Sequence, residues 1–504
     1  MRYIDLIIDR VTMYRLLLYY LAALLCVAMF LGAIGVLTYS PYSIALSAAF
    51  FLAICYGVNY VFAKIYETPS NTESSILTAL ILSLIISPLT SPKDITFFGA
   101  AAGLAIASKY ILAIRHKHIF NPAAIAVVLT AFGPQESASW WVGSTALLPF
   151  VIIGGVLIAR KIRRNNMVFT FFGTAIASVA VFALLNGKDI LPTLQDTVLH
   201  SSLFFLGFVM LTEPWTSPAT KTKRYIYACI VGFLFSPLIH IGSIYSTPEL
   251  ALVIGNFAAF MMSPLVKTKL TIFRRDMYGR RTEDVEFVPN RRFNYKPGQY
   301  IEMTLPHKSA DSRGYRRYFT LASSPTEETL RIGIRYYDNG STFKKHLHSG
   351  DFDKGLSIGQ LGGDFTLPNE SQTKFAFIAG GIGITPFRSM VKYLTDTGDA
   401  RSVKLLYGER SVSDVAYSTI FEQARTKGTI DTHYIIAEPS TVRSSSIIYG
   451  TIDADLIKMQ IPDYLDRTFY ISGPQPMVLA IKDDLKKMGV SSRRIKVDYF
   501  FGYA

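Results

Sequence analysis

The hydrophobic positions follow two different patterns along the chain. Up to about residue 266 they form long apolar runs, whereas residues 267–504 alternate short apolar stretches with polar ones. A helix needs about 20 apolar residues to cross a bilayer. The first pattern predicts ten membrane-spanning segments, near residues 15–38, 42–65, 73–89, 95–114, 121–133, 140–159, 166–186, 197–212, 223–242 and 249–266. The fifth is short, which is typical of a half-helix or a re-entrant segment.

Charged residues in the loops between these runs separate into two sets. One set is basic, as in the loop 160–164, and the alternate loops are more acidic, as around Asp189 and Glu249. Basic loops are expected in the cytoplasm, so ten spans place both termini there and predict a multi-pass protein of the cell membrane. Most of the net charge of +14 flanks apolar runs. We therefore expect a lipid membrane, and no nucleic acid, as its partner.

A short motif occurs twice, each time at the end of an apolar run, as SPLTSP (87–92) and EPWTSP (213–218). The prolines of the two copies, Pro88 and Pro214, are 126 positions apart, and NPAAIAVVLTAF from Asn121 faces TPELALVIGNFA from Thr247 at the same offset. Five spans separate the copies, and an odd number inverts the second. The pattern predicts inverted five-helix repeats with sites at broken helices. The alternative is that each motif only ends a helix and begins a loop.

The second pattern predicts two water-soluble domains. Period-two stretches indicate the strands of a small antiparallel barrel at 299–306, 316–324 and 330–337. Beyond about residue 367, apolar strands such as KFAFIAGG alternate with helices such as PFRSMVKYL, which indicates a parallel sheet. The expected fold is multidomain, with a polytopic all-α membrane domain (1–266), an antiparallel β-barrel (267–367) and an α/β parallel-sheet domain (368–504).

Cysteine and histidine usage limits the possible redox centres. The three cysteines all lie in apolar runs without metal or disulfide spacing. We therefore expect no metal and no iron–sulfur cluster. The spans offer mainly His200 and His240, too few for a transmembrane pair of haems. Lys109, Glu213 and His200 are the ionisable residues within the spans, and each is a candidate either for an ion path or for an interface position.

Two motifs in the barrel region carry residue types that suit a nucleotide. In RYFT, Arg317 can pair with a pyrophosphate, and Phe319 on the same strand face can flank a planar ring. The hydroxyl of Thr320 can bond a ring nitrogen. In DNGSTFKKHL, the small residues 340–342 precede a short helix whose N-terminus suits an anion. Taken alone, the first motif fits an ordinary barrel strand and the second an N-cap.

Two further motifs each follow an apolar strand of the parallel sheet. AGGIGITP (379–386) stands between a strand and a helix, where glycines allow a tight turn and the close approach of a dinucleotide. It does not fit Gly-x-Gly-x-x-Gly, so its position between strand and helix carries the argument. YISGPQPM (470–477) also ends a strand, at the edge where parallel sheets bind ligands.

In this order and spacing, the four motifs resemble the ferredoxin–NADP reductase superfamily over about residues 267–504. The resemblance implies an oxidoreductase that binds FAD and either NADH or NADPH. It implies FAD contacts from Arg317, Phe319, Thr320, Arg335, Gly340, Ser341 and Thr342, with the last four near the pyrophosphate. It implies dinucleotide contacts from Gly380, Gly381, Gly383, Thr385, Pro386, Gly473 and Pro474.

The end of the chain extends this resemblance. The family's Cys-Gly-Pro is Ser-Gly-Pro here, beginning at Ser472, and VDYFFGYA resembles the family's acidic-x-Phe-x-Gly-Tyr end. The resemblance assigns Thr320, Ser472 and Asp498 to hydride transfer and places Phe500 against the flavin. The alternative for the last segment is a plain β-strand with one buried face.

Part of the first half carries a second resemblance. HIFNPAAIAVV, GGVLIARKIRR and FVMLTEPWTSPAT look like the flavin-bearing membrane subunits of the Rnf complex and of the sodium-pumping NADH:quinone reductase, over about residues 60–266. The resemblance implies ten spans in two inverted halves, a membrane flavin (FMN or riboflavin) and possible partner subunits. The family attaches FMN to a threonine in Ser-Gly-Ala-Thr, which is absent here. The nearest string, VGSTALLP with Thr145, has a different order.

Together these features predict a membrane-bound, flavin-dependent NAD(P)H oxidoreductase. Electrons would pass from NAD(P)H through FAD into or across the membrane, to a quinone or another electron acceptor. The alternative is a transporter or channel for a small solute with a fused reductase. Glu409 suits the ribose diol of NADH and Arg410 suits the 2′-phosphate of NADPH, so both substrates stay open.

Overall fold

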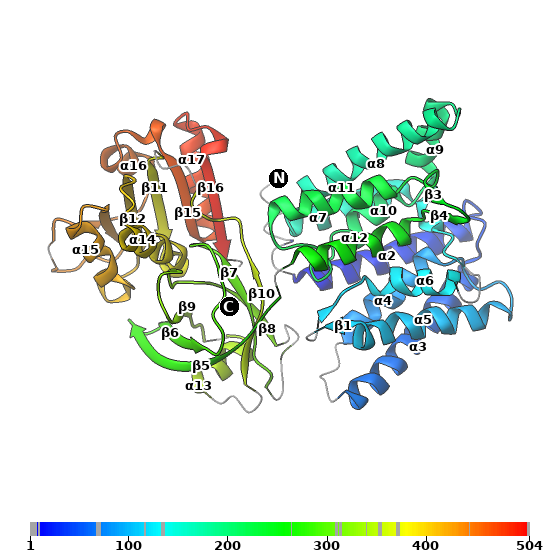
Figure 1. The fold of residues 1–504 in the computed structure, drawn as a ribbon, viewed down its shortest axis with the longest axis horizontal. Coiled ribbons are helices and arrows are strands. Elements are labelled where there is room, and N and C mark those ends of the chain that lie inside the picture. The colour runs from blue at the N-terminus through cyan, green and yellow to red at the C-terminus, as the bar shows by residue number, and fades with distance from the viewer. Residues whose placement is uncertain are drawn as a thin grey trace. The chain divides into compact units, whose positions relative to one another are not determined.

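The computed structural model divides the chain into two compact units, Met1–Ser263 and Pro264–Ala504 (Figure 1). The first unit is mainly helical, and the second contains an antiparallel sheet followed by a parallel one. The structure describes residues 8, 11–66, 72–114, 117–132, 137–263, 265–307, 311, 315–338, 340–350, 355–368, 373–442 and 444–500.

The first unit, called the helical unit below, consists of helices joined by short loops (Figure 1). In chain order they are α2 (Met13–Ala33), α3 (Pro41–Ile65), α4 (Thr72–Ile85), α5 (Asp94–Ile111), α6 (Pro122–Phe132), α7 (Leu148–Lys161), α8 (Asn165–Leu185), α9 (Ile190–His200), α10 (Leu203–Phe205), α11 (Lys221–Leu234) and α12 (Pro248–Met262). A π-helix, Leu206–Met210, follows α10. Small hairpins precede α6 and α12, formed by β1 (Ala113–Ile114) with β2 (Lys117–His118) and by β3 (His240–Ile241) with β4 (Ile244–Tyr245).

Helix is present in each of the ten predicted ranges. Within the described residues, three helices are both long and apolar enough to cross a bilayer, namely α2, α3 and α8. Their outer faces carry apolar side chains such as Phe169 and Leu185, which are 67% and 72% exposed. Such apolar exteriors mark a surface that meets lipid or another partner. Three candidate spans are therefore present, and ten spans with this orientation stay a prediction.

Side-chain caps and prolines set where several of these helices begin. The hydroxyl of Ser40 accepts a hydrogen bond from the backbone N–H of Ser43 (3.1 Å), and that of Thr247 accepts one from Leu250 (3.3 Å). A proline follows each cap at the first helical position, where its missing N–H costs nothing. The chain entry into α3 and α12 is thus fixed by local sequence.

The second unit begins with six antiparallel strands, called the barrel below, in the order β8-β7-β10-β5-β6-β9. They are β5 (Leu265–Tyr278), β6 (Thr282–Pro289), β7 (Tyr300–Thr304), β8 (Arg316–Thr320), β9 (Leu330–Arg335) and β10 (Leu356–Gly362). A bridge between Leu321 and Ile332 joins the ends of the two edge strands. Helix α13 (Thr342–Ser349) buries Phe343 and Leu347 in the barrel core.

Residues 375–500, called the sheet lobe below, form a six-stranded parallel sheet in the order β14-β13-β12-β11-β15-β16. Its strands are β11 (Phe375–Gly380), β12 (Val403–Glu409), β13 (Ile430–Ile436), β14 (Ile447–Tyr449), β15 (Thr468–Pro474) and β16 (Ile495–Phe500). Its main helices are α14 (Thr385–Thr397), α15 (Ser418–Thr426), α16 (Ala454–Gln460) and α17 (Gln475–Lys487).

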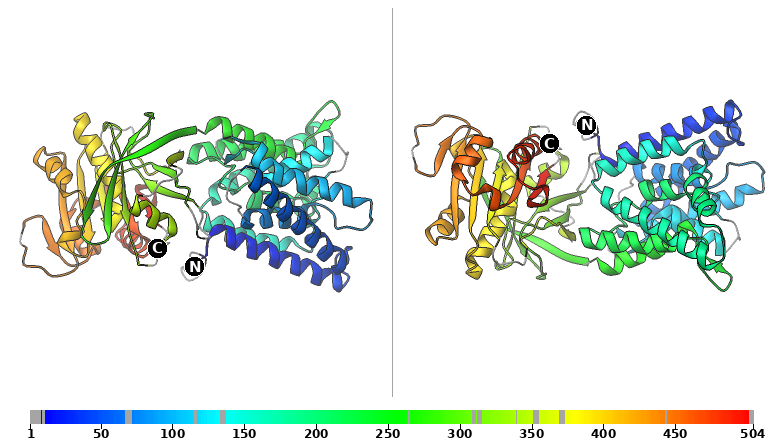
Figure 2. Two further views of the ribbon diagram at one scale, coloured as in Figure 1. Left: turned by 90° about the horizontal axis from the view of Figure 1, so that it is seen from below. Right: turned by 90° about the horizontal axis from the view of Figure 1, so that it is seen from above.

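Helices cover both faces of this sheet (Figure 2). Phe387 of α14 and Phe421 of α15 share a buried core with Phe377 of β11, whereas Val478 of α17 packs with the next strand residue, Ile378. Successive residues of a strand point to opposite faces, so α14 and α15 lie on one face and α17 on the other. The predicted order of an antiparallel barrel followed by an α/β parallel sheet is confirmed.

Candidate functional site

The carboxyl ends of β11 and β15 form the centre of the candidate site in the sheet lobe. From β11 the chain steps outward to β12, β13 and β14, then returns to the other side of β11 for β15 and β16. Such a reversal of strand order leaves a crevice at the carboxyl ends of the strands, where α/β sheets bind ligands. Ala379 pairs with Ser472, and Ser472 pairs with Asp498 on the next strand. Both predicted motifs and the acidic residue therefore meet at this crevice.

Glycines let the two loops approach each other closely. A Cβ added to Gly383 would lie 2.4 Å from the carbonyl oxygen of Ser472, and one added to Gly380 would lie 2.3 Å from Sδ of Met477. Gly381 has a φ of +56°, in the left-handed region that side chains disfavour. These positions explain the glycines of AGGIGITP, because the turn is tight and leaves no room for a Cβ at Gly380 or Gly383.

Ser472 is fully buried beside this turn. Its hydroxyl oxygen has no hydrogen-bond partner within the described residues. A buried unpaired hydroxyl costs about 1–3 kcal/mol, so it marks a position where a bound ligand can supply the missing partner. Thr385 and Pro386 instead start α14, since Thr385 donates a hydrogen bond to the carbonyl of Ile382 (3.1 Å) and Pro386 occupies the first turn.

Arg335, at the end of β9, lies against the same glycine turn. Its Nη1 is 2.7 Å from the position that a Cβ on Gly381 would take, and 3.8 Å from Oε2 of the buried Glu409. Within the described residues its guanidinium makes no hydrogen bond. Burial raises the pKa of Glu409 to about 7, although the nearby Arg335 acts in the opposite direction. Arg335 is predicted from the sequence to lie near the FAD pyrophosphate, and in the structure its guanidinium lies against the glycine turn.

Arg317, one of the residues predicted to hold FAD, lies near the N-terminus of α13. The guanidinium of Arg317 on β8 lies 5.4 Å from the ring centre of Phe343, and its Nη2 is 3.5 Å from Oδ1 of Asp311. The other oxygen of Asp311 accepts a hydrogen bond from the backbone N–H of Thr342 (3.1 Å). A carboxylate thus occupies the position where a helix N-terminus binds anions. A pyrophosphate bound there would take over the same donors.

The opposite end of α13 is held by the barrel. Arg275 of β5 donates to the backbone carbonyls of Leu347 (2.6 Å) and His348 (3.0 Å) and pairs with Glu283 of β6 (2.9 Å). At the start of the helix, Ser341 is the N-cap. A cation at the carboxyl end complements the helix dipole, as the Asp311 carboxylate does at the N-terminus.

The remaining predicted residues of the barrel take different positions. Phe319 is buried in the barrel core with its ring 5.9 Å from that of Phe343, and Thr320 is buried at the end of β8. The N–H of Gly340 donates to the carbonyl of Tyr337 (2.8 Å), which forms the turn before α13. The structure therefore brings Arg317, Phe319 and α13 together.

The last strand is described as backbone only at its end. Phe500 pairs with Pro474, so the carboxyl end of β16 lies beside the Ser-Gly-Pro segment. The side chain of Phe500, which the sequence places against the flavin, lies outside the described residues. The position of Asp498 next to Ser472 is set by the strand register.

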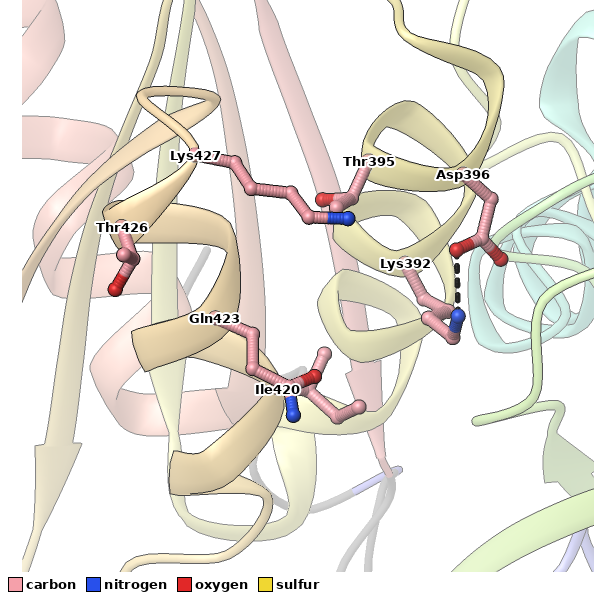
Figure 3. Close-up of a pocket in the computed structure, with 7 residues that line it drawn as sticks. All are labelled: Lys392, Thr395, Asp396, Ile420, Gln423, Thr426 and Lys427. Carbon is pink, nitrogen blue, oxygen red and sulfur yellow. Dashed lines mark hydrogen bonds and ion pairs between the residues drawn. The ribbon is translucent and has the colours of Figure 1, made fainter.

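A separate cavity of about 480 Å³ lies between α14 and α15 (Figure 3). Its lining consists of Lys392, Thr395, Asp396, Ile420, Gln423, Thr426 and Lys427. These residues come from the second half of α14, from one side of α15 along its length and from the residue that follows α15. Lys392 is paired with Asp396. The cavity lining includes none of the residues predicted to bind a nucleotide.

The helical unit contains a polar cluster around Glu213, in the EPWTSP segment (213–218) that follows the π-helix. Oε1 of Glu213 lies 3.3 Å from Nε2 of His118, and its Oε2 accepts hydrogen bonds from Nδ2 of Asn121 (2.8 Å) and from the hydroxyl of Thr216 (3.3 Å). The imidazole of His118 stacks on Trp215 with ring centres 5.2 Å apart. Breaks of this kind free backbone groups, which polar side chains then satisfy.

Asn256 of α12 extends this cluster. Its Oδ1 accepts a hydrogen bond from the backbone N–H of Asn121 (2.9 Å), and its Nδ2 donates to the hydroxyl of Tyr227 (3.0 Å). The sequence predicts Glu213 as a candidate but does not predict its partners, although two of them lie in the segment HIFNPAA and Asn256 lies in VIGNFAA. Lys109 donates instead to the carbonyl of Ser74 (2.8 Å), and His200 is a surface residue beside an aspartate.

Comparison with known families supports both halves of this description. Residues 136–271 match the model of the NQR2, RnfD, RnfE family, and residues 377–483 match that of the oxidoreductase NAD-binding domain. These matches confirm the two resemblances seen in the sequence for the ranges that they cover. The first range contains Glu213 of the polar cluster, and the second contains the glycine turn and Ser472.

Individual relatives match through the second half. The stachydrine N-demethylase reductase subunit Stc4 of Rhizobium meliloti is 29% identical over 213 residues, which is 41% of this chain and 59% of that protein. A flavohemoprotein of Oceanobacillus iheyensis is 27% identical over 209 residues, 40% of this chain and 51% of that protein. The chain therefore spans little more than half the length of these curated relatives.

One solved structure illustrates the same region. The flavohem-like FAD/NAD binding domain of nitric oxide dioxygenase from Vibrio cholerae has 20% identity, covers 47% of this chain and 99% of that chain, and gives a TM-score of 0.41.

Proposed function

We propose that this chain is a membrane-bound NAD(P)H oxidoreductase that passes electrons from NAD(P)H through FAD into or across the membrane. The observation that carries the proposal is the crevice at β11 and β15, where the glycine turn lies against Ser472, whose hydroxyl has no hydrogen-bond partner among the residues that the structure describes. The match to an oxidoreductase NAD-binding domain supports it. So do the relatives, which include the stachydrine N-demethylase reductase subunit and the reductase component of a propane 2-monooxygenase.

FAD would be held at the barrel. When bound, FAD accepts a hydride from NAD(P)H and can release the two electrons one at a time. Arg317 and the N-terminus of α13 would hold its pyrophosphate, because both already bind the carboxylate of Asp311. Phe319 and Thr320 would lie at the ring end of the site, since they continue β8 away from Arg317.

NAD(P)H would bind at the glycine turn. The glycines let a dinucleotide backbone approach the turn closely, and Arg335 places a guanidinium beside Gly381 that makes no hydrogen bond among the described residues. Glu409 is buried and faces Arg335, so it acts as the counter-ion of that arginine rather than as a reader of the ribose diol. Arg410 is 75% exposed and is bonded to Glu438 (2.5 Å). These contacts do not distinguish NADH from NADPH, so both are candidate substrates.

The helical unit would form two inverted five-helix repeats, and the structure offers new support for this. Pro122 and Pro248 both start helices, α6 and α12, at the predicted offset of 126 residues. The residues before them, Asn121 and Thr247, both cap their helix by accepting a hydrogen bond from the N–H three positions on. A two-stranded hairpin precedes each helix. These correspondences support a repeated unit larger than the SPLTSP and EPWTSP motifs alone.

Helix packing repeats in the same way. Helix α3 packs on α5 as α8 packs on α11, and α5 packs on α6 as α11 packs on α12. The related helices α6 and α12 pack on each other, as do α2 and α7. Contacts between equivalent elements are expected when two halves are related by a pseudo-two-fold axis. The polar cluster around Glu213 lies at the contact of α6 and α12, which is where such folds place their sites.

We propose that this repeat interface carries a second, non-covalent flavin, FMN or riboflavin, between FAD and the final electron acceptor. A quinone or an acceptor at the outer face would complete the path. The proposal rests on the match of residues 136–271 to the NQR2, RnfD, RnfE family. Thr145 is exposed, but the family's attachment tetrapeptide is absent around it.

Flavin stoichiometry of the full purified chain tests this function. Denaturation should release one FAD and a second flavin per chain, and anaerobic NADH or NADPH should bleach the FAD absorbance. A chain without FAD would overturn the oxidoreductase proposal. One FAD with no second flavin would contradict the two-flavin path and favour solute transport by a helical unit fused to a reductase.

A further inference from the structure

Tyr417 joins the barrel to the sheet lobe at a strained backbone position. It immediately precedes α15 and has φ +61° and ψ +19°, in the left-handed region. A tyrosine rarely adopts this conformation, and it persists only where the surrounding structure fixes it. The side-chain contacts of Tyr417 supply that fixation.

Three elements meet the Tyr417 side chain. Its hydroxyl donates a hydrogen bond to Oδ1 of Asp284 on β6 (2.7 Å), and its ring lies 5.4 Å from that of Tyr278 on β5. The guanidinium of Arg388 on α14 lies 5.7 Å from the ring centre on another side. Two of these partners belong to the barrel and one to the sheet lobe, so one residue connects both.

The Asp284 carboxylate is a buried anchor for this contact. Its side chain is 1% exposed, and its second oxygen accepts a hydrogen bond from Nη1 of Arg331 on β9 (2.7 Å). Arg388 in turn bonds the carboxylate of Glu327 (2.8 Å) and the carbonyl of Ala322 (3.0 Å), both in the β8–β9 connection. Hydrogen bonds to buried charged groups are stronger than neutral ones and are costly to leave unmade.

This anchor lies directly behind the glycine turn. A Cβ added to Gly333 of β9 would be 2.9 Å from the Tyr417 hydroxyl and 2.6 Å from side-chain atoms of Ile382 and Thr385. Gly333 therefore lets the barrel strand touch the turn and Tyr417 together. The same strand ends at Arg335, which faces Gly381.

We propose that Tyr417 is a positioning residue, which fixes the dinucleotide turn against the barrel and thereby sets the distance between the two bound nucleotides. The inference rests on the proposed function, because it assigns hydride transfer to these two sites. Transfer requires the reacting atoms to lie about 3–3.5 Å apart, and a misplacement of 1 Å costs about 100-fold in rate. A bond from one residue of the sheet lobe to a buried barrel carboxylate suits that demand.

The test compares Tyr417→Phe with Tyr434→Phe in the full chain. Tyr434 is a matched control, since it is also a buried tyrosine that donates to a carboxylate, Glu422 (3.3 Å), but within the sheet lobe. Both variants keep the aromatic ring. Asp284→Asn, which keeps the shape of the acceptor, serves as a second variant if Tyr417→Phe folds poorly.

Three quantities are measured: the rate of flavin reduction at saturating NAD(P)H, the dissociation constant of NAD(P)H, and amide hydrogen exchange of β9. We expect Tyr417→Phe to slow flavin reduction about tenfold, which equals about 1.4 kcal/mol at 25 °C. The dissociation constant and the FAD content should stay near wild type, and β9 amides should exchange faster. Tyr434→Phe should leave all of these unchanged.

Two results would overturn the inference. Tyr417→Phe could lower thermal stability without changing the reduction rate or β9 exchange, which would make Tyr417 a packing residue only. Tyr434→Phe could slow flavin reduction as much as Tyr417→Phe does. The effect would then not be specific to the hydrogen bond between Tyr417 and Asp284 of the barrel. If the wild-type chain shows no flavin reduction, the proposed function fails. Amide exchange then tests the contact of Tyr417 with the barrel by itself, and unchanged exchange of β9 in Tyr417→Phe would contradict the positioning role.

Discussion

Arg335 and Arg317 should serve different nucleotides, although both are barrel arginines at strand ends. Arg317 faces Asp311 and the start of α13, whereas Arg335 faces Gly381 and Glu409. Arg335→Met should therefore weaken NAD(P)H binding and leave FAD in place. Arg317→Met should weaken FAD binding. The two substitutions remove the same charge and keep an unbranched apolar stem, so each is the control of the other.

The expected size follows from the contacts of Arg335. A hydrogen bond between charged groups contributes about 1.5–3 kcal/mol, which corresponds to a factor of about 10–150 in a dissociation constant. The charge of Arg335 is partly neutralised by Glu409, whose Oε2 lies 3.8 Å from its Nη1. We therefore expect a loss near the lower end, about tenfold. Arg335→Lys should recover only part of it, because lysine lacks the planar fork of donors.

The assay has two parts on the same purified protein. Flavin content per chain is determined after denaturation, and dissociation constants are obtained by titrating the oxidised protein with NAD⁺ or NADP⁺ while the flavin spectrum is recorded. The reasoning is refuted if Arg335→Met loses FAD and Arg317→Met retains it. Unchanged dinucleotide affinity in Arg335→Met would also refute it.

Three further predictions follow from other contacts. Glu409 has a pKa of about 7 in the folded protein, against an ordinary value of 4.5. Its contribution to the free energy of unfolding should therefore fall as the pH rises between these two values and stay level above them. Glu409→Gln should remove this fall, which is measured by thermal unfolding across the pH range. Gly383→Ala places a Cβ 2.4 Å from the Ser472 carbonyl and should abolish NAD(P)H-dependent flavin reduction while FAD stays bound, as seen by stopped-flow absorbance. Asn256→Leu leaves the buried N–H of Asn121 unpaired and should cost about 1–3 kcal/mol, lowering the thermal stability of the helical unit without changing the rate of flavin reduction.

Local sequence predicted those parts of the site that depend on backbone geometry. The glycine turn after β11 and the Ser-Gly-Pro segment after β15 follow from strand, turn and helix signals within about ten residues. Their meeting in one crevice follows from strand order, which short-range patterns only suggest. The start of α13 was predictable for the same reason, because Ser341 caps a helix with a clear pattern.

Contacts between residues far apart in the chain could not be predicted from the sequence pattern. Arg335 follows a barrel strand, so its neighbours in sequence suggest FAD, but its guanidinium reaches a turn almost fifty positions away. Tyr417 and Asp284 are 133 positions apart, and no periodicity links them. In the helical unit, Glu213 stood out as a charge in an apolar region, whereas His118 and Asn121 matter only because two helix breaks come together there.

Helix lengths also differed from the hydropathy pattern for a physical reason. The apolar run at 73–89 continues to the SPLTSP motif, but α4 ends at Ile85 because the prolines that follow cannot continue the hydrogen-bond ladder. Hydropathy measures where apolar residues stand, and helix length also depends on where backbone groups can be paired.

Electron transfer across a sealed membrane tests the central claim most directly. The full chain is reconstituted into vesicles that contain ferricyanide, and NADH or NADPH, which cannot cross the bilayer, is added outside. We predict that the trapped ferricyanide is reduced, and that Arg335→Met slows its reduction at subsaturating NAD(P)H. If the trapped ferricyanide stays oxidised while ferricyanide added outside in a parallel sample is reduced, transmembrane transfer is contradicted. The chain would then be an NAD(P)H reductase confined to one face of the membrane.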